Sequence, residues 1–226
     1  MFGDTLIWIL ILPGMLLGGF AQSRVKAHVA KYSRVPLSQG LTGAQVARYI
    51  LDARGLQSVR IEPSKGVLSD HYDPRGKVLR LSEAVYGVPS IAAAGIAAHE
   101  AGHAIQDADD YLPMEARSRI VPLVKAGSSI APFVFLGGLM MGSSLVTWTG
   151  AILFGLSSLF ALITLPVEFD ASRRAIRLLE ETGIIRDRQE LDGAEEVLRA
   201  AAWTYVAAAV AAVGSWAMYL AMSRRR

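Results

Sequence analysis

Residues 126–167 read AGSSIAPFVFLGGLMMGSSLVTWTGAILFGLSSLFALITLPV, 42 consecutive positions without an Asp, Glu, Lys or Arg. One α-helix of this length would be about 63 Å long, roughly twice the thickness of a bilayer's hydrocarbon core. The segment is therefore expected to enter a membrane and return. We place its turn at Thr147-Trp148-Thr149-Gly150, because tryptophan favours the membrane interface.

Two further segments, 5–23 and 200–223, also lack charged residues. Each is long enough to cross a bilayer once, although the second is rich in alanine and can also lie along the membrane. Only 19% of the chain is charged and its mean hydropathy is +0.35, which excludes a disordered protein. The sequence predicts a mainly α integral membrane protein with about four membrane helices and the lipid bilayer as a partner.

The basic residues Arg24, Lys26, Lys31 and Arg34 directly follow the first apolar segment. The positive-inside rule then places residue 24 onward in the cytoplasm of a multi-pass protein of the inner (plasma) membrane. Four crossings would leave the arginines at 224–226 outside, against the rule, but the basic residues of the soluble segments outnumber them. A net charge of only +3 gives no indication of a nucleic-acid partner.

This distribution of charge predicts five regions along the chain. They are an N-terminal membrane anchor (1–23), a cytoplasmic-side segment with a small sheet (24–125), a membrane helical hairpin (126–167), a soluble helical segment (168–199), and a C-terminal hydrophobic helix with a basic tail (200–226).

Local signals predict helices and strands within the polar regions. Thr42 and Gln45 have capping-box spacing before an apolar face, and Ser90 suits the N-cap of an alanine-rich helix. Gly183 is expected to end the helix that follows Pro166. The predicted elements are helices at 43–54 and from 91 to about 106, with strands at 56–62, 67–72 and 78–82.

The alanine-rich helix carries the sequence His99-Glu100-Ala101-Gly102-His103. Residues four apart share one face of a helix, so His99 and His103 can bind one Zn²⁺, while Glu100 can act as general base. The chain has no cysteine, so any metal must be held by His, Asp or Glu. The alternative is a pair of unrelated histidines on a core helix.

A catalytic zinc site needs a third protein ligand. Glu168 is the preferred candidate, because the returning hairpin brings it to the same side of the membrane as the histidines. A carboxylate this close to lipid also requires a partner. Asp170 competes for this role, and Glu168 can otherwise be an acid favoured by a helix N-terminus. Four nearer acids are expected to point away from the histidines: Asp107, Asp109, Asp110 and Glu115.

Two blocks, GVLSDHYDPRGKVLRLSEAVYGVPSIAAAGIAAHEAGHAIQ (66–106) and TLPVEFDASRRA (164–175), resemble the YugP-type family of membrane-bound neutral zinc metallopeptidases. The chain is distantly similar to HtpX and the CAAX prenyl endopeptidase. The resemblance implies a small α+β domain of the gluzincin type, one Zn²⁺ ion, and Glu168 as third ligand. Ser172 stands where the distant relatives have Asp. In those relatives the Asp is the usual hydrogen-bond partner of a metal-binding histidine, so the residue with that role in this chain is left unassigned.

Several residues are candidates for supporting roles. His71 can stabilise an oxyanion, support the metal centre, or be a turn histidine bonded to a neighbouring carboxylate. Tyr72 can donate to an oxyanion, as can Tyr86. Arg173 and Arg174 can neutralise Glu168 or Asp170, bind a substrate carboxylate, or anchor the chain at the membrane.

These features together predict a membrane-embedded zinc endopeptidase that hydrolyses membrane or membrane-proximal proteins, with Glu100 as general base. An extended peptide would pair with strand 78–82. The alternatives are a non-catalytic zinc-binding membrane scaffold and a zinc hydrolase acting on other bonds. A transporter with an accidental motif would need polar groups buried in its spans, and 126–167 contains no charged residue.

Overall fold

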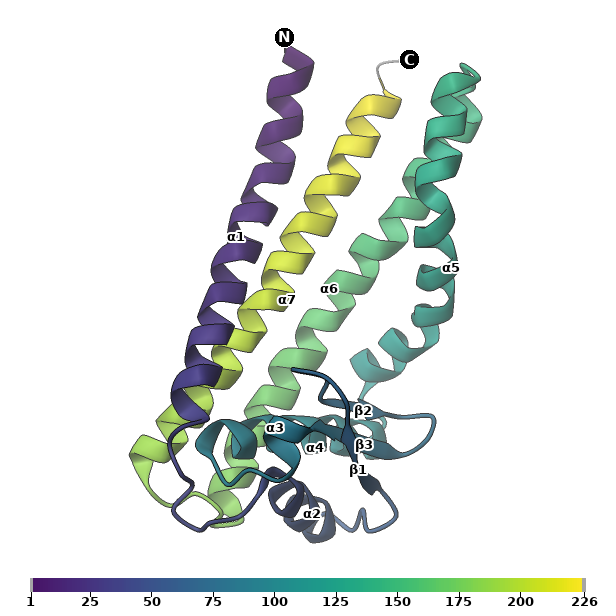
Figure 1. The fold of residues 1–226 in the computed structure, drawn as a ribbon. Helices are drawn as coiled ribbons and strands as arrows, with labels where there is room; N and C mark the ends of the chain where they lie inside the picture. Colours follow the sequence, from purple (N-terminus) through teal and green to yellow (C-terminus); the bar gives the residue numbers. More distant parts are fainter. Residues whose placement is uncertain (1, 225–226) are drawn as a thin grey trace. The chain divides into compact units, whose positions relative to one another are not determined.

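The computed structural model describes residues 2–224 (Figure 1). Met1 of the predicted anchor, with Arg225 and Arg226 of the predicted basic tail, lies outside the described residues. The chain forms two compact units. Unit 1 comprises residues 1–21, 115–166 and 203–226, and unit 2 comprises residues 22–114 and 167–202.

Seven helices and three strands follow one another along the described chain. Their bounds are α1 (Phe2–Tyr32), α2 (Gly43–Ala53), β1 (Arg60–Ser64), β2 (His71–Asp73), β3 (Val78–Ser82), α3 (Glu83–Tyr86), α4 (Ile91–Ala108), α5 (Leu112–Met140), α6 (Ser144–Glu181) and α7 (Arg188–Ser223).

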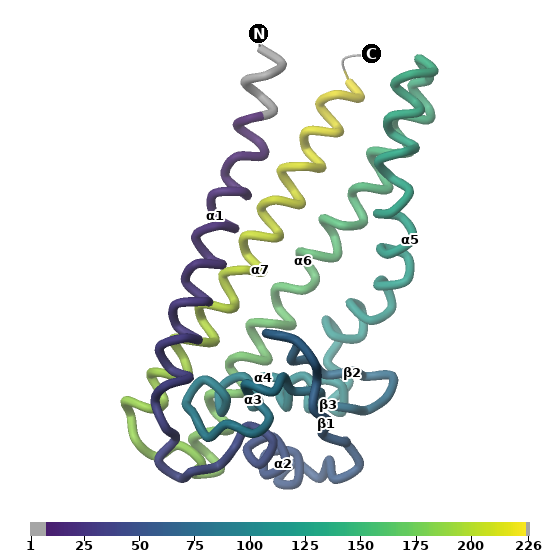
Figure 2. The backbone as a smooth tube through the Cα atoms, viewed as in Figure 1, coloured from purple at the N-terminus to yellow at the C-terminus, as the bar shows by residue number. Residues whose placement is uncertain are grey.

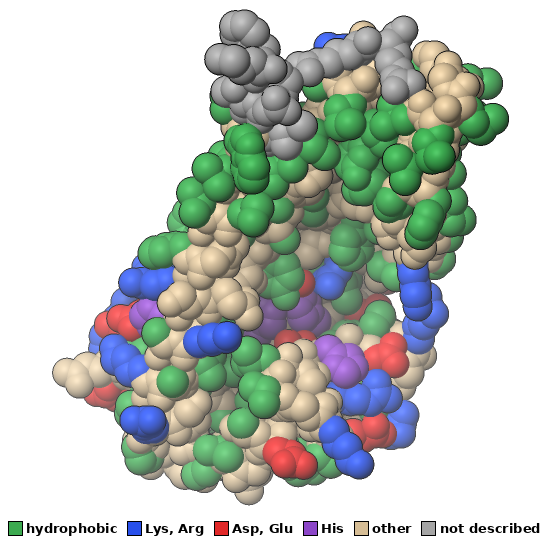
Figure 3. All heavy atoms as spheres, turned by 45° about the horizontal axis from the view of Figure 1, so that its top comes forward, with side chains coloured by type: hydrophobic (Ala, Val, Ile, Leu, Met, Phe, Trp, Pro, Cys, Tyr) green, Lys and Arg blue, Asp and Glu red, His purple; other side chains and the backbone are tan. Residues whose placement is uncertain are grey.

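Four of these helices are long and apolar enough to cross a membrane, within the described part of the chain. In Figure 3, hydrophobic side chains cover most of the visible surface of unit 1, whereas charged side chains gather over unit 2. The expectation of a mainly helical protein with four membrane helices and a small sheet is confirmed at this level. The four candidate spans are Trp8–Tyr32, Leu112–Met140, Ser144–Glu181 and Arg188–Ser223.

Small residues bring the helices of unit 1 close together. A Cβ atom on Gly14 of α1 would lie 2.6 Å from the Cα atom of Ala211 of α7. The Ser158 hydroxyl of α6 donates a hydrogen bond of 2.8 Å to the carbonyl oxygen of Ala212. Helices in lipid associate through such close packing and polar contacts, because apolar burial alone does not favour association there.

The helical hairpin of unit 1 turns earlier than the sequence predicts. Helix α5 ends at Met140 and α6 begins at Ser144, so the predicted turn at 147–150 is wrong (Figure 2). Gly142 adopts a positive φ of 65°, which a side chain would disfavour, and it reverses the chain there. Thr147 lies inside α6, where its hydroxyl donates to the carbonyl oxygen of Ser143.

Unit 2 contains a three-stranded sheet of order β1-β3-β2, with β1 parallel and β2 antiparallel to β3. The strand predicted at 78–82 is confirmed, whereas the other two begin later than predicted. Residues 56–59 form a turn in which the Val59 amide donates to the Leu56 carbonyl oxygen. Leu68 has a φ of 54°, which is incompatible with an extended strand.

Strand β3 is the central strand of this sheet. Both of its edges are hydrogen-bonded, since Arg60 of β1 pairs with Val78 and His71 of β2 pairs with Arg80. The prediction that a substrate peptide pairs along 78–82 is therefore wrong, because Val78–Arg80 is paired with a strand on both edges. Only Arg80 of this strand is part-exposed, and its other four residues are buried.

The predicted helix starts of unit 2 are confirmed. Thr42 and Gln45 form a capping box at α2, and the Ser90 hydroxyl accepts from the Ala93 amide at the start of α4. Helix α4 packs through alanines into a core of aliphatic side chains from α2, β3, α6 and α7. Helix α6 continues through Pro166 to Glu181, and Gly183 follows with a φ of 68°, as its predicted role at the helix end requires.

The contact between α1 and α7 gives a direct test of unit 1 packing. We expect Gly14→Ala to lower thermal stability in detergent, because the new Cβ atom meets backbone and overpacking costs about 1–3 kcal/mol. Gly18→Ala is the matched control on the same helix, since nothing lies within 4 Å of its Cβ position. An equal or higher melting temperature for Gly14→Ala would contradict the close approach of the two helices.

Candidate metal centre

Helix α4 presents the two histidines of the motif on one face. His99 and His103 are separated by one helical turn, and their ring centroids lie 4.7 Å apart with nearly perpendicular planes. The helix itself is buried over most of its length, which holds the two side chains on a rigid support. His103 is buried and His99 is part-buried.

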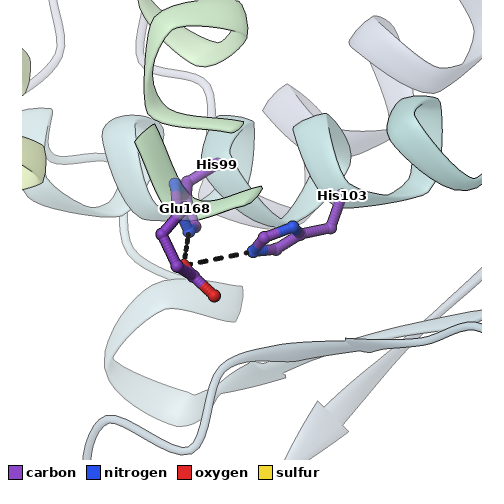
Figure 4. Close-up of side chains that lie close together, drawn as sticks. All are labelled: His99, His103 and Glu168. Atoms are coloured by element: carbon purple, nitrogen blue, oxygen red, sulfur yellow. Dashed lines mark hydrogen bonds and ion pairs between the residues drawn. The ribbon is translucent and has the colours of Figure 1, made fainter. Parts of the chain in front are cut away.

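Helix α6 supplies a carboxylate to the same point. Glu168 is 2% exposed, and its Oε2 atom lies 3.2 Å from His99 Nε2 and 3.5 Å from His103 Nε2. Figure 4 shows both rings pointing toward this carboxylate. The structure therefore brings the two histidines together with a carboxylate that lies 69 positions after His99 in the sequence.

The donor set fits a zinc ion in number, type and spacing. One ligand atom from each of the three residues lies within 4.8 Å of the others. Tetrahedral zinc with bonds of 2.0–2.1 Å separates its ligand atoms by about 3.3 Å. The two distances from Glu168 Oε2 to the imidazole nitrogens, 3.2 and 3.5 Å, match that separation.

The approach of α6 to α4 depends on a glycine inside the motif. A Cβ atom on Gly102 would lie 2.9 Å from the carbonyl oxygen of Ala171, closer than real Cβ atoms approach. Ala171 stands between Glu168 and Ser172 on α6, both of which contact His99. Gly102 thus sets the distance between the histidines and their carboxylate partner.

Each histidine also has a partner for its second ring nitrogen. The Ser172 hydroxyl lies 3.2 Å from His99 Nδ1, and the Gln106 Oε1 atom lies 2.9 Å from His103 Nδ1. Partners of this kind orient metal-binding histidines and select the tautomer. Ser172, whose presence left this support unassigned in the sequence, thus lies beside His99. The role of Gln106 was not predicted.

The competing carboxylate, Asp170, faces away from the imidazoles. Its Oδ2 atom accepts hydrogen bonds from Gln106 Nε2 at 2.9 Å and from Arg174 Nε at 2.6 Å. Arg173 is exposed and reaches Asp170 only at 3.7 Å. Arg174 also pairs with Asp109. Three roles were considered for the two arginines, and the contacts with Asp170 match the neutralisation of that carboxylate.

The two candidates on β2 are hydrogen-bonded to partners other than the three converging residues. His71 is exposed, and its Nδ1 atom lies 2.8 Å from the carbonyl oxygen of Ser69, so it bonds the main chain and not the expected carboxylate. The Tyr72 hydroxyl donates to Asp107 at 2.7 Å, and Lys77 pairs with the same carboxylate. The Asp107 carboxylate therefore contacts Tyr72 and Lys77. This agrees with the prediction that it points away from the histidines.

Burial, hydrogen bonds and nearby charges shift the pKa of His103 and of Tyr72. Burial alone would lower the pKa of His103, but the hydrogen bond with Glu168 and the charge of Glu100 outweigh it, and the pKa is raised. Burial, together with the hydrogen bond to Asp107, raises the pKa of Tyr72 well above its usual value. Tyr72 therefore remains a neutral hydroxyl at physiological pH.

Glu100 is buried beside the histidines, with 8% of its surface exposed. Among the described residues, no donor is hydrogen-bonded to its carboxylate. A carboxylate without a bound donor is free to accept a proton from another molecule. Glu100, the predicted general base, is the next residue along α4 from His99.

Comparison with known proteins agrees with this geometry. A family model described as "Putative neutral zinc metallopeptidase" matches residues 7–224. The chain belongs to this family. It is 48% identical over 201 residues to the "Putative membrane protease YugP" of Bacillus subtilis (strain 168), covering 89% of each chain. No solved structure matches it.

Membership of this family implies zinc, and Gly102 offers a test of how the centre is held. We expect Gly102→Ala to weaken zinc binding in competition with a chelator, because the new Cβ atom pushes Ala171, and with it Glu168, away from α4. Gly95→Ala is the matched control, since its nearest contact on α7 is an ordinary 3.5 Å. Equal zinc affinity for the two variants would show that the spacing of α4 and α6 does not control the centre.

Proposed function

We propose that this protein is a membrane-embedded zinc endopeptidase of the gluzincin type. His99, His103 and Glu168 would hold one zinc ion, and Glu100 would be the general base. The observation that carries the proposal is the convergence of Glu168 on both imidazole nitrogens at 3.2 and 3.5 Å. Family membership as a zinc metallopeptidase supports the same conclusion.

When bound, zinc supplies Lewis acidity that polarises a peptide carbonyl and makes water easier to deprotonate. The carboxylate of Glu100 accepts the proton of the attacking water and returns it to the leaving amine nitrogen. Ser172 and Gln106 keep the rings of His99 and His103 in place through their Nδ1 atoms. Glu168 is almost without solvent exposure, so bulk water does not surround this ligand of the proposed zinc ion.

Substitution of the general base separates metal binding from catalysis. We expect Glu100→Gln to keep its zinc but to cleave casein or a membrane peptide about 100- to 10,000-fold more slowly, because the amide cannot accept the proton. Glu168→Ala should lose zinc and activity together. Both are measured on detergent-purified protein, as metal content and cleavage rate.

Glu180→Gln is the matched control for this experiment, because it removes an exposed carboxylate from α6 and should change neither quantity. Full cleavage by Glu100→Gln would refute the peptidase mechanism. A protein that binds zinc through the three residues and cleaves no substrate would instead be the zinc-binding scaffold.

We further propose that the protein resides in the inner (plasma) membrane with its metal centre on the cytoplasmic side. Four helices are long and apolar enough to span, and the YugP relative is named a membrane protease. The basic cluster from Arg24 to Arg34 follows the apolar part of α1, which favours the cytoplasm for unit 2. Membrane or membrane-proximal proteins are then the substrates closest to the site.

The lack of cysteine makes this topology measurable. We expect a membrane-impermeant maleimide to label Met141→Cys in intact cells, because Met141 is exposed at the turn between α5 and α6. Lys65→Cys, exposed in unit 2, should be labelled only after permeabilisation. Labelling of both variants in permeabilised cells is the control, and labelling of Lys65→Cys from outside would place the metal centre on the other face.

A further inference from the structure

Gln106 is a polar side chain in the interior of unit 2 that takes no part in the proposed proton transfers. It lies three residues after His103 on α4 and is completely buried. Its amide oxygen lies 2.9 Å from His103 Nδ1, and its amide nitrogen donates to the Val167 carbonyl oxygen at 2.8 Å and to Asp170 Oδ2 at 2.9 Å. Every side of the amide group is therefore engaged.

The orientation of this amide follows from its neighbours. The main-chain carbonyl of Val167 can only accept a hydrogen bond, and the Asp170 carboxylate is paired with the guanidinium of Arg174 and also accepts. A reversed amide would set its oxygen against two other acceptors and leave the nitrogen facing His103. The Gln106 nitrogen must therefore point to α6 and its oxygen to the imidazole.

An oxygen in that place selects one form of the imidazole. Because Gln106 Oε1 is an acceptor, His103 Nδ1 must carry the hydrogen that joins them. In the neutral ring the lone pair then lies on Nε2, the atom that faces Glu168 at 3.5 Å. This is the nitrogen that the proposed zinc ion would require.

We propose that Gln106 is a positioning residue that holds His103 in the Nδ1-protonated tautomer. It would be the middle of a chain of hydrogen bonds that runs from the part-buried Arg174 through Asp170 and Gln106 to the buried His103. The chain links α4 to α6 at the level of the metal ligands and orients His103 before the metal arrives. This inference rests on the metal centre of the proposed function.

The two histidines differ in how firmly they are held. The Ser172 hydroxyl beside His99 can rotate and can either donate or accept, so it does not dictate a tautomer. Ser172 is also part-exposed, so water can replace its hydroxyl. Loss of Gln106 instead leaves Nδ1 of the buried His103 without its acceptor and takes one donor away from the Val167 carbonyl and from Asp170, which keeps Arg174.

Zinc affinity gives the first test. We expect Gln106→Met, which keeps the length of the side chain but removes its amide, to bind zinc about 10- to 100-fold more weakly than the wild type. Ser172→Ala is the matched control and should lose distinctly less affinity. Equal affinity of Gln106→Met and the wild type would overturn the inference while leaving the peptidase proposal intact.

The tautomer itself gives the second test, which needs no catalytic activity. In alkaline buffer, ¹⁵N shifts of the imidazoles of metal-free wild-type protein should show hydrogen on His103 Nδ1. The chain has four histidines, and substitution of His28 and His71 removes two of them from the spectrum. In Gln106→Met the resonances of His103 should move toward the Nε2-protonated form.

The outcomes separate the two proposals. If Gln106→Met does not fold, the wild-type tautomer alone decides, and hydrogen on Nε2 of His103 would refute the role of Gln106. If the wild type binds no zinc, the proposed function fails, yet the tautomer of the metal-free ring still confirms or refutes the positioning role.

Discussion

A buried carboxylate against two imidazoles is the interaction on which the arrangement of unit 2 depends. Glu168 is almost without contact with solvent, and removing an ionised carboxylate from water costs several kcal/mol unless it is paired. His99 and His103 supply that pairing from a different helix. The same contact therefore stabilises the packing of α6 on α4 and gathers the ligands of the proposed zinc ion.

The backbone makes this contact possible because both helices carry small residues where they meet. Gly102 lies against the main chain of Ala171, and alanines fill much of the remaining surface of α4. The motif thus combines the proposed chemistry with packing in five residues, since two histidines and an acid would serve the metal centre while a glycine lets the partner helix approach. Gln106, one turn further on, joins the same two helices through hydrogen bonds.

Much of this could be predicted from the sequence, because its signals are local. The capping residues Thr42 and Ser90 mark helix starts through hydrogen bonds within one turn, and the structure confirms both. The predicted turn of the hairpin was misplaced because tryptophan also occurs inside helices, and Trp148 lies within α6. The chain reverses at Gly142, which adopts a positive φ. The peptide-binding role of 78–82 failed because the sequence does not reveal which strand is central.

The sequence by itself determined that the chain has long uncharged segments, that a His-Glu-x-x-His pattern lies on a helix, and that an acid follows the hairpin. These properties depend on composition and on spacing within one turn of helix. Only the tertiary structure decided that Glu168 and not Asp170 faces the imidazoles, and that Gln106 and Ser172 stand behind them. Those choices depend on the rotation and closeness of helices that are distant along the chain, which only packing sets.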